Sequence, residues 1–389
     1  MEKGKVKYIC FFDAEQNALE KRTQSPAAHQ KISFMLSLLT ELNYSVDIIS
    51  PVQTQLKETF GGKEILISNG IKLKLFKTYG KHGLFSLIKR KMLRYREFKN
   101  YLNNTICKDD IVVLYHSMEY LDFFLKLKEK RDFKLIFEME EVYSDANGFS
   151  KKTKNKELLL AEKADAFVFP SYSMNSLINK NNVPYIVIHG DYRTNRINKN
   201  NSQKNNYKIV YSGTFEFSKG GVFNALQLAP FLPSNAELYI MGFGTKKQVD
   251  KVVSLCTEMQ KKSDCKIIYL GCLDSASCEN FLKKSDIGLC TQNSNAIFNA
   301  SSFPSKVLTY LKNGLKVVCC KSESLTTSDI SNLLFFYDGD TPENIAKAVA
   351  KAISSETNEN VLFEHLEMLR RGSLIKLGEL LNNIKVEQK

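Results

Sequence analysis

Short apolar runs alternate along the first half of the chain with longer stretches whose apolar positions recur every three or four residues. The runs predict buried strands at 5–12, 44–50, 110–116, 133–140, 165–170 and 184–190. Two alternating runs in 63–77 flank Asn69-Gly70, which predicts a hairpin. Helical periodicity separates the strands, most clearly at 27–42 and 83–102. Strands joined through helices predict right-handed crossovers and a largely parallel sheet.

The second half repeats this pattern after a polar interruption. Residues 193–206, RTNRINKNNSQKNN, carry too little apolar surface for a core, which predicts a linker. Further strands are predicted at 208–213, 236–242, 266–271, 286–291, 315–320 and 332–337. A last helical segment covers 358–386. We therefore predict an α/β protein of two Rossmann-like doubly wound domains, at 1–192 and 207–371.

Composition supports a globular protein of two domains. The chain has 389 residues, of which 43% are hydrophobic and 25% are charged. No apolar run approaches the roughly 20 residues of a membrane-spanning helix, and the chain starts without a signal-peptide core. The nine Cys are odd in number and form no C-x-x-C pair, so we expect reduced core thiols and no zinc. These features favour a cytoplasmic protein.

Positive charge is concentrated in one segment. The net charge is +13, and residues 51–100 carry 12 basic and 3 acidic residues, a net of +9. Such a segment indicates an anionic partner, either a phosphorylated substrate, an anionic membrane or a nucleic acid. A solvated basic face is the alternative. No nucleic-acid-binding module is recognisable, so we expect no nucleic-acid partner.

The basic segment includes an amphipathic helix at 84–102. Its predicted apolar stripe contains Leu84, Ile88, Met92, Tyr95, Phe98 and Leu102. The remaining surface is basic, and we expect Lys89, Arg90, Arg94 and Arg96 to face an anionic cytoplasmic leaflet. The alternative is a packed helix with a solvated basic side.

Three strand-end loops of the second half are candidates for binding phosphate. KIVYSGTFEFSKGG, at 208–221, joins a strand ending at Gly213 to a helix start at Lys219-Gly220-Gly221. MGFG, at 241–244, contains Gly242 and Gly244. FPSKVLTYLKNGLKVV, at 303–318, places Pro304, Ser305 and Lys306 in a first helical turn. Glycines allow close backbone approach and helix starts attract anions, although each loop alone also fits an ordinary strand–turn–helix.

Taken in this order, with YLG at 269–271 and SDIGL at 285–289, these motifs resemble the nucleotide-sugar half of glycosyltransferase family 4, in its F-P-S-K subgroup. Weaker similarities in the first half include YHS at 115–117, EMEEVYSD at 138–145 and IHGDY at 188–192. The resemblance implies the GT-B architecture, in which two Rossmann-like domains face a cleft. It also implies that 372–389 packs back on the first domain.

The resemblance assigns donor-binding roles by position. Lys219 matches the lysine that contacts the donor diphosphate, whereas Thr214 stands where an Arg is usual. Ser302 and Thr309 occupy the positions of a carboxylate pair common in the family. Ser305 and Lys306 would then supply the charge that Thr214 does not. The implied donor-binding residues are Gly213, Thr214, Lys219, Gly242, Gly244, Ser305, Lys306 and Thr309.

The first half supplies the implied catalytic and acceptor-side residues. His116, which ends a predicted strand, matches a cleft-facing His of the family, and Glu140 stands where His-Asp is common. A carboxylate there is suited to take the acceptor proton. Simple surface acids are the alternative for one or two of Glu138, Glu140 and Glu141. We expect Ser25, Pro26 and Glu141 on the acceptor side.

The resemblance implies a hexosyltransferase that uses a nucleotide diphosphate sugar, with a UDP-sugar as the default, and no cofactor. We also expect no metal, because Lys219, Lys306 and a helix start would stabilise the charge of the leaving group. A glycan or lipid-linked glycan would accept the sugar with retention of configuration, in biosynthesis of a surface polysaccharide such as a capsule or O-antigen. The alternative is a catalytically silent sugar-nucleotide-binding subunit, which the missing carboxylates at 302 and 309 favour. An epimerase would need more acid and base groups than we can place.

Overall fold

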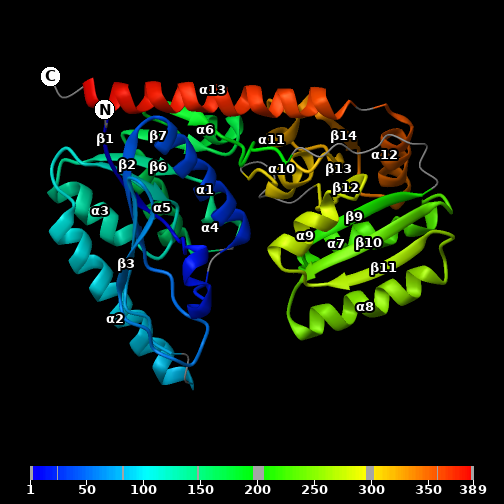
Figure 1. Ribbon diagram of the computed structural model, residues 1–389, viewed down its shortest axis with the longest axis horizontal. Helices are drawn as coiled ribbons and strands as arrows, with labels where there is room; N and C mark the ends of the chain where they lie inside the picture. Colours follow the sequence, from blue (N-terminus) through cyan, green and yellow to red (C-terminus); the bar gives the residue numbers. More distant parts are fainter. Residues whose placement is uncertain are drawn as a thin grey trace. The chain divides into compact units, whose positions relative to one another are not determined.

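The computed structural model describes residues 3–23, 25–80, 83–146, 149–195, 206–294, 302–356 and 358–386 (Figure 1). The chain divides into two compact units: unit 1 contains Met1–Gly190 and Gly372–Lys389, and unit 2 contains Asp191–Arg371. The predicted first domain ends two residues later, at 192. Most of the predicted linker, 196–205, lies outside the described residues.

The described strands of unit 1 form one sheet in the order β3-β4-β2-β1-β5-β6-β7-β8. They are β1 (Gly4–Ile9), β2 (Tyr44–Ser50), β3 (Lys63–Ser68), β4 (Ile71–Leu75), β5 (Ile111–Tyr115), β6 (Lys134–Glu138), β7 (Ala166–Phe169) and β8 (Tyr185–Val187). Only β3 is antiparallel to its neighbour among them, in the predicted hairpin with Gly70 at a φ of 81°. All five residues of β5 are buried, as expected for a central parallel strand.

Helices connect these strands. They are η1 (Glu15–Glu20), α1 (Pro26–Glu41), α2 (Gly83–Thr105), α3 (Leu121–Lys130), α4 (Tyr143–Ala146), α5 (Lys151–Glu162) and α6 (Tyr172–Ile178). The core between them contains many aromatic side chains, including Phe98, Phe124 and Phe137. From the centre of the sheet, the strands proceed through β1 and β2 toward one edge and through β5 and β6 toward the other. The carboxyl ends of β1 and β5 therefore mark the topological switch point, where sheets of this kind bind ligands.

The described strands of unit 2 form an all-parallel sheet in the order β11-β10-β9-β12-β13-β14. They are β9 (Tyr207–Thr214), β10 (Ala236–Phe243), β11 (Lys266–Gly271), β12 (Ile287–Cys290), β13 (Lys316–Cys320) and β14 (Leu334–Tyr337). This is the strand order of a dinucleotide-binding Rossmann domain, with its switch point between β9 and β12. The predicted doubly wound α/β class is confirmed.

The helices of unit 2 follow its strands. They are η2 (Phe217–Lys219), α7 (Gly221–Gln227), η3 (Ala229–Phe231), α8 (Lys246–Gln260), α9 (Ser275–Leu282), α10 (Ser305–Leu311), α11 (Glu323–Thr326), η5 (Ser331–Leu333) and α12 (Pro342–Ser354). Helix α8 starts with a capping box between Thr245 and Gln248. It packs against the edge strand β11 (Figure 1).

Helix α13 (Glu359–Val386) begins in unit 2 and ends in unit 1. Its last part packs on unit 1 as the resemblance implied. A Cβ on Gly378 would lie 3.1 Å from the Leu42 Cδ2, and the Lys385 ammonium donates to the Lys3 carbonyl at 2.8 Å. The same ammonium lies 4.6 Å from the centre of the Tyr44 ring. These contacts join the end of the chain to its beginning.

Candidate active site

Two glycines allow the ends of β9 and β10 to approach each other very closely. Gly242 has a φ of 150°, and a Cβ at this position would lie 1.8 Å from the Gly213 carbonyl oxygen. Gly244 is also tightly enclosed, because a Cβ there would lie 2.9 Å from the Gln248 Oε1. The two motifs singled out in the sequence therefore lie side by side, with Gly213 and Gly242 opposite each other at the carboxyl ends of β9 and β10.

Lys306 extends from the first turn of α10 to Gly213, at the end of β9. A Cβ on Gly213 would lie only 2.8 Å from the Lys306 Nζ. The ammonium also lies 4.3 Å from the centre of the Tyr211 ring. Burial raises the pKa of the Cys290 thiol, at the end of β12, to about 11, and the Lys306 charge opposes that rise. The ends of β9 and β12 therefore both lie beside this lysine.

Tyr310 fixes the position of α10. Its buried hydroxyl accepts a hydrogen bond from the Ser212 backbone N–H at 2.8 Å. Its ring occupies the space beside Gly288, where a Cβ would lie 2.3 Å from ring carbons. Because any side chain at 288 would displace this ring, the glycine is part of what holds Lys306 in place.

Lys219 ends η2 and is more exposed than Lys306. Its side chain is 53% exposed and pairs with Glu216 at 3.1 Å. The following Gly220 has a φ of 74°, and Gly221 begins α7. A Cβ on Gly221 would lie 2.6 Å from the Tyr211 hydroxyl, so this turn and Lys306 both contact Tyr211.

The remaining predicted donor-side residues lie at the same edge of unit 2. Thr214 and Ser305 are exposed. Pro304 is the N-cap of α10 rather than a residue of its first turn, because the helix starts one residue later than the sequence suggested. The Thr309 hydroxyl donates to the Ser305 carbonyl within the helix, at 3.2 Å. Ser302 is half-buried in the segment before α10.

His116 is an internal residue of unit 1. Its side chain is fully buried, and its Nε2 lies 3.1 Å from the Glu157 Oε1. It stacks on Tyr143, with 4.5 Å between ring centres. Burial opposes ionisation of Glu157, but contacts with His116 and Ser144 outweigh it and lower the Glu157 pKa. The imidazole therefore lies against the Glu157 carboxylate in the interior of unit 1, which the strand position alone did not reveal.

Glu138 and Glu140 differ sharply in environment. Glu138 is fully buried and accepts a hydrogen bond from the Tyr8 hydroxyl, so it is not the surface acid that we allowed for. Burial raises its pKa to about 7, with Lys31 opposing and Glu140 adding to the rise. Glu140 is half-buried and pairs with the Lys31 ammonium at 2.5 Å. Glu141 is half-buried beside it in the chain.

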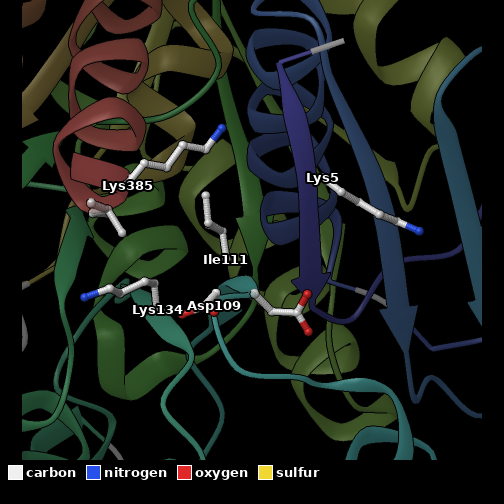
Figure 2. A pocket seen from close by; sticks show the side chains of 7 residues that line it. Lys5, Asp109, Ile111, Lys134 and Lys385 are labelled. Carbon is white, nitrogen blue, oxygen red and sulfur yellow. The ribbon is translucent and has the colours of Figure 1, made fainter. Parts of the chain in front are cut away.

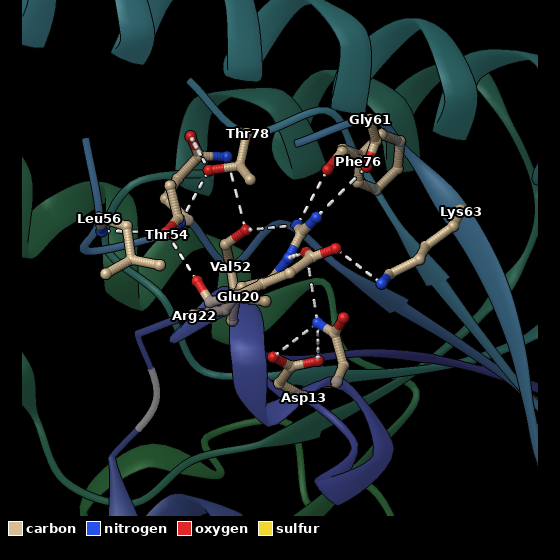
Figure 3. A network of polar contacts seen from close by, with 12 residues as sticks. Asp13, Glu20, Arg22, Val52, Thr54, Leu56, Gly61, Lys63, Phe76 and Thr78 are labelled. Atoms are coloured by element: carbon tan, nitrogen blue, oxygen red, sulfur yellow. Dashed lines mark hydrogen bonds and ion pairs between the residues drawn. The ribbon is translucent and has the colours of Figure 1, made fainter. Parts of the chain in front are cut away.

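The loop after β1 is held by a buried polar network in unit 1 (Figure 3). The Arg22 guanidinium donates to Glu20 at 2.7 Å and to the Phe76 carbonyl at 2.9 Å. Thr54 donates to the Glu20 carbonyl at 2.6 Å. The network joins the loops that follow β1, β2 and β4. Ser25 and Pro26 come just after it and are exposed at the start of α1.

Two of the predicted membrane-facing cations bond inward. Arg90 donates to the Gln53 Oε1 at 3.3 Å and to the Thr54 carbonyl, and Arg94 pairs with Glu119. Arg96 is exposed as predicted, whereas the Lys89 side chain lies outside the described residues. Phe98 and Leu102 of the apolar stripe are buried, but Ile88 and Met92 are 63% and 68% exposed.

Unit 1 contains two cavities of note. One, of about 930 Å³, lies between α2 and the loops after β1, β2 and β5. The other, of about 340 Å³, lies at the amino ends of β1, β5 and β6, away from the ligand-binding edge (Figure 2). Its Lys5 and Lys134 side chains run outward in opposite directions, and Lys5 pairs with Asp47 at 2.6 Å. Only the larger cavity faces the carboxyl ends of the strands.

One ground for expecting no metal, the lack of a D-x-D triplet, was wrong, because Asp338-Gly339-Asp340 is such a triplet and follows β14. Asp340 accepts hydrogen bonds from the backbone and hydroxyl of Ser294, both at 2.9 Å, and Asp338 pairs with Lys321 at 3.3 Å. In the part of the chain that the structure describes, no three metal-ligating side chains gather. No described helix is long and apolar enough to cross a membrane.

Comparison with solved structures identifies the fold. Sucrose-phosphate synthase from Thermosynechococcus elongatus matches 99% of this chain and 100% of its own, with a TM-score of 0.73 at 11% identity. A trehalose-6-phosphate structure from E. coli, bound with UDP-2-fluoro glucose, matches 98% and 99%, with a TM-score of 0.70 at 10% identity. This is the GT-B fold.

A third match is an α,α-trehalose-phosphate synthase (UDP-forming) from Burkholderia xenovorans in complex with glucose-6-phosphate. It covers 98% of this chain and 100% of its own, with a TM-score of 0.66 at 8% identity. No family model and no curated protein matches the chain. The likeness therefore establishes the GT-B fold, while membership of glycosyltransferase family 4 stays a prediction from the motifs.

Proposed function

We propose that this GT-B protein is a glycosyltransferase that moves a hexosyl-type sugar from a nucleotide diphosphate donor to a glycan or lipid-linked glycan. One observation carries the proposal: the Lys306 ammonium lies against Gly213, where the ends of β9 and β10 meet at the switch point of a Rossmann sheet. Glycine backbone and a lysine together are suited to a diphosphate. Of the three structures described above, one is bound with UDP-2-fluoro glucose and one is named as UDP-forming, which supports a UDP-sugar donor.

The chemistry of sugar transfer needs a cation at this place. Cleavage of the bond between the sugar and the diphosphate leaves negative charge on the leaving group. Lys306 would stabilise that charge from a fixed position, since α10 is held by Tyr310 on β9. Such preorganised groups each contribute about 2.7–4 kcal/mol to the transition state. Lys219, exposed on the neighbouring turn, would move toward the diphosphate and exchange its pairing with Glu216 for one with phosphate.

Unit 1 would supply the acceptor side. We assign Glu140 to the acceptor hydroxyl, because this carboxylate is half-buried and oriented by Lys31 at 2.5 Å. We assign His116 a positioning role through Glu157, whose carboxylate also accepts hydrogen bonds from the Tyr143 and Ser144 backbone N–H groups. Retention of configuration is part of the proposal because the motif resemblance implies it. Independence from metal ions is part of it because Lys219 and Lys306 would take the role of a metal at the diphosphate.

The cellular setting is proposed on the same basis. A cytoplasmic protein that docks at the inner membrane face would meet lipid-linked acceptors for a surface polysaccharide. Support comes from α2, on which Ile88 and Met92 are exposed beside the exposed cations Lys91 and Arg96. Large exposed apolar side chains next to basic ones are typical of helices that lie on anionic membranes.

Turnover of a radiolabelled UDP-hexose by the purified chain tests the proposal. We expect release of UDP with transfer of label to an acceptor extract or, more slowly, to water. The second candidate, a silent sugar-nucleotide-binding subunit, is favoured by Ser302 and Thr309 at the usual carboxylate positions. It predicts saturable UDP binding with no turnover, and an absence of both would refute the two functions together.

A further inference from the structure

The larger cavity of unit 1 combines an apolar wall with a cationic end. Phe11, Met92, Tyr95 and Met118 contribute apolar surface, and Arg90 and Arg94 project from α2. Its volume of about 930 Å³ is in the range of pockets that enclose ligands of a few hundred daltons. Most of the lining is apolar, so the cavity is poorly suited to a ligand that is polar throughout.

The two arginines differ in how their charge is balanced. Arg94 pairs with the Glu119 carboxylate in the same cavity, which neutralises it. Arg90 contacts only uncharged oxygens among the described residues, those of the Gln53 amide and the Thr54 carbonyl. Its burial and the nearby Arg94 charge lower the Arg90 pKa, although an arginine remains protonated. The cavity thus contains a cation that lacks an anion.

Arg90 is also held in position. Gln53, which it contacts, accepts a second hydrogen bond from the Thr78 hydroxyl at 3.2 Å. The Thr78 hydroxyl in turn accepts from the Thr54 backbone N–H at 2.7 Å. Both threonines belong to the network around Arg22 (Figure 3). A fixed guanidinium is suited to bidentate recognition of phosphate, because little conformational freedom is lost on binding.

We propose that this cavity binds an acceptor whose apolar body carries a phosphate group, with the phosphate on Arg90 and the body against Phe11, Met92 and Met118. That this ligand is the acceptor rests on the proposed function, whereas the proposal that the cavity binds a phosphate-bearing amphiphile does not. A membrane-borne amphiphile fits the geometry, because Met92 belongs both to the cavity and to the exposed apolar surface of α2. A free sugar phosphate would leave the apolar wall unused.

Calorimetric titration of the full chain tests this with decyl phosphate below its micelle concentration. We expect decyl phosphate to bind at least tenfold more tightly than inorganic phosphate, glucose 6-phosphate or decanol. Arg90→Met should weaken decyl phosphate at least tenfold, while Lys126→Ala, an equal charge change at an exposed site on α3, should leave it unchanged. Equal binding of decyl phosphate and inorganic phosphate, or an unaffected Arg90→Met variant, would overturn the proposal.

A second variant protects the test against misfolding of Arg90→Met. Met118→Glu puts a carboxylate into the cavity lining and should also weaken decyl phosphate at least tenfold. UDP binding, measured on the same samples, reports on unit 2. If the wild-type chain does not bind UDP, the proposed function is refuted. If the wild-type chain binds UDP but not decyl phosphate, only the proposed acceptor cavity is refuted.

Discussion

At the scale of single residues, Lys306 is the side chain on which the proposed donor site depends. It lies beside Gly213 and over the Tyr211 ring, and α10 is anchored to β9 through Tyr310. We predict that Lys306→Ala lowers turnover about 10²–10³-fold, the cost of removing one preorganised charge donor. Steady-state kinetics with a UDP-sugar measures this. Lys261→Ala, at the end of α8, is the matched control and should retain wild-type rates.

Replacement of Lys219 should lower turnover less than replacement of Lys306. Because its ammonium is exposed and pairs with Glu216, part of its contribution is screened by solvent in the free protein. We expect Lys219→Ala to lower turnover at least about tenfold, which is a loss of roughly 1.4 kcal/mol. Near wild-type rates for both lysine variants would contradict the phosphate site.

Glu138 gives a pH dependence whose sign follows from its raised pKa. Below about pH 4.5 the carboxyl is protonated in both the folded and the unfolded chain. Between there and its folded pKa of about 7, only the folded chain keeps the proton, so stability falls as pH rises through this window. In the wild type, the free energy of unfolding should fall by about 3 kcal/mol between the two ends of this pH window. We predict that Glu138→Gln removes this decrease.

Urea unfolding at pH 4.5 and pH 7.5 measures the Glu138 prediction. Glu15→Gln, at an exposed position, is the control and should follow the wild-type curve at both pH values. A Glu138→Gln variant whose stability falls with pH as steeply as the wild type would show that Glu138 ionises normally in the folded chain.

Gly242 is the residue that sets how closely β9 and β10 approach. Any side chain there would overlap the Gly213 carbonyl, and the φ of 150° is itself unfavourable for other residues. We predict that Gly242→Ala lowers the free energy of unfolding by more than about 3 kcal/mol. Gly61→Ala, with no atom within 4 Å of its Cβ position, should change it little. Thermal unfolding of both variants measures this difference. Equal melting temperatures of the two variants would contradict the close approach of Gly242 to the Gly213 carbonyl.

At the scale of secondary-structure elements, helix α2 shows what periodicity can and cannot predict. The apolar stripe was correct at Phe98 and Leu102, which are buried in the core of unit 1. The same spacing continues to Ile88 and Met92, which are exposed. Periodicity identifies a face of a helix, but how far the neighbouring core extends along that face depends on tertiary packing.

Side-chain direction was the other feature that the sequence left open. Strand ends and glycine turns were predictable because local propensities and parallel topology agree, and so Lys306 and Gly213 came together as expected. His116 follows β5 and Glu138 is the last residue of β6, yet both are buried in the interior. Their burial depends on partners distant in sequence, Glu157 and Tyr8, which no local pattern identifies.

The exposed part of α2 carries its own prediction. If this surface docks on anionic membranes, Met92→Asp should lower co-sedimentation with phosphatidylglycerol vesicles by at least tenfold, because it replaces buried apolar contact with a repelled charge. Leu177→Asp, at a similarly exposed position on α6, is the control and should bind as wild type. Binding that is indifferent to the anionic lipid content would rule out electrostatic docking.

At the scale of the whole molecule, the proposed function assigns donor and acceptor to separate sheets. Unit 2 has the strand order of a nucleotide-binding domain, with a lysine at its switch point. Unit 1 has its own switch point between β1 and β5, with a large cavity beside it. Donor and acceptor recognition should therefore be separable, so that a ligand for one unit is bound even when the site in the other is disabled.

A thermal-shift panel of nucleotides and nucleotide sugars tests this division on the intact chain. A ligand at 100 times its dissociation constant adds about 2.7 kcal/mol of stability to the state that binds it. We predict that UDP and one or more UDP-sugars raise the melting temperature, that Lys306→Ala removes the shift, and that Arg90→Met preserves it. Addition of EDTA should leave the shift unchanged, because the proposed diphosphate site uses lysines. A panel without any nucleotide shift would contradict the donor site, and a shift abolished by Arg90→Met would contradict the separation of the two units.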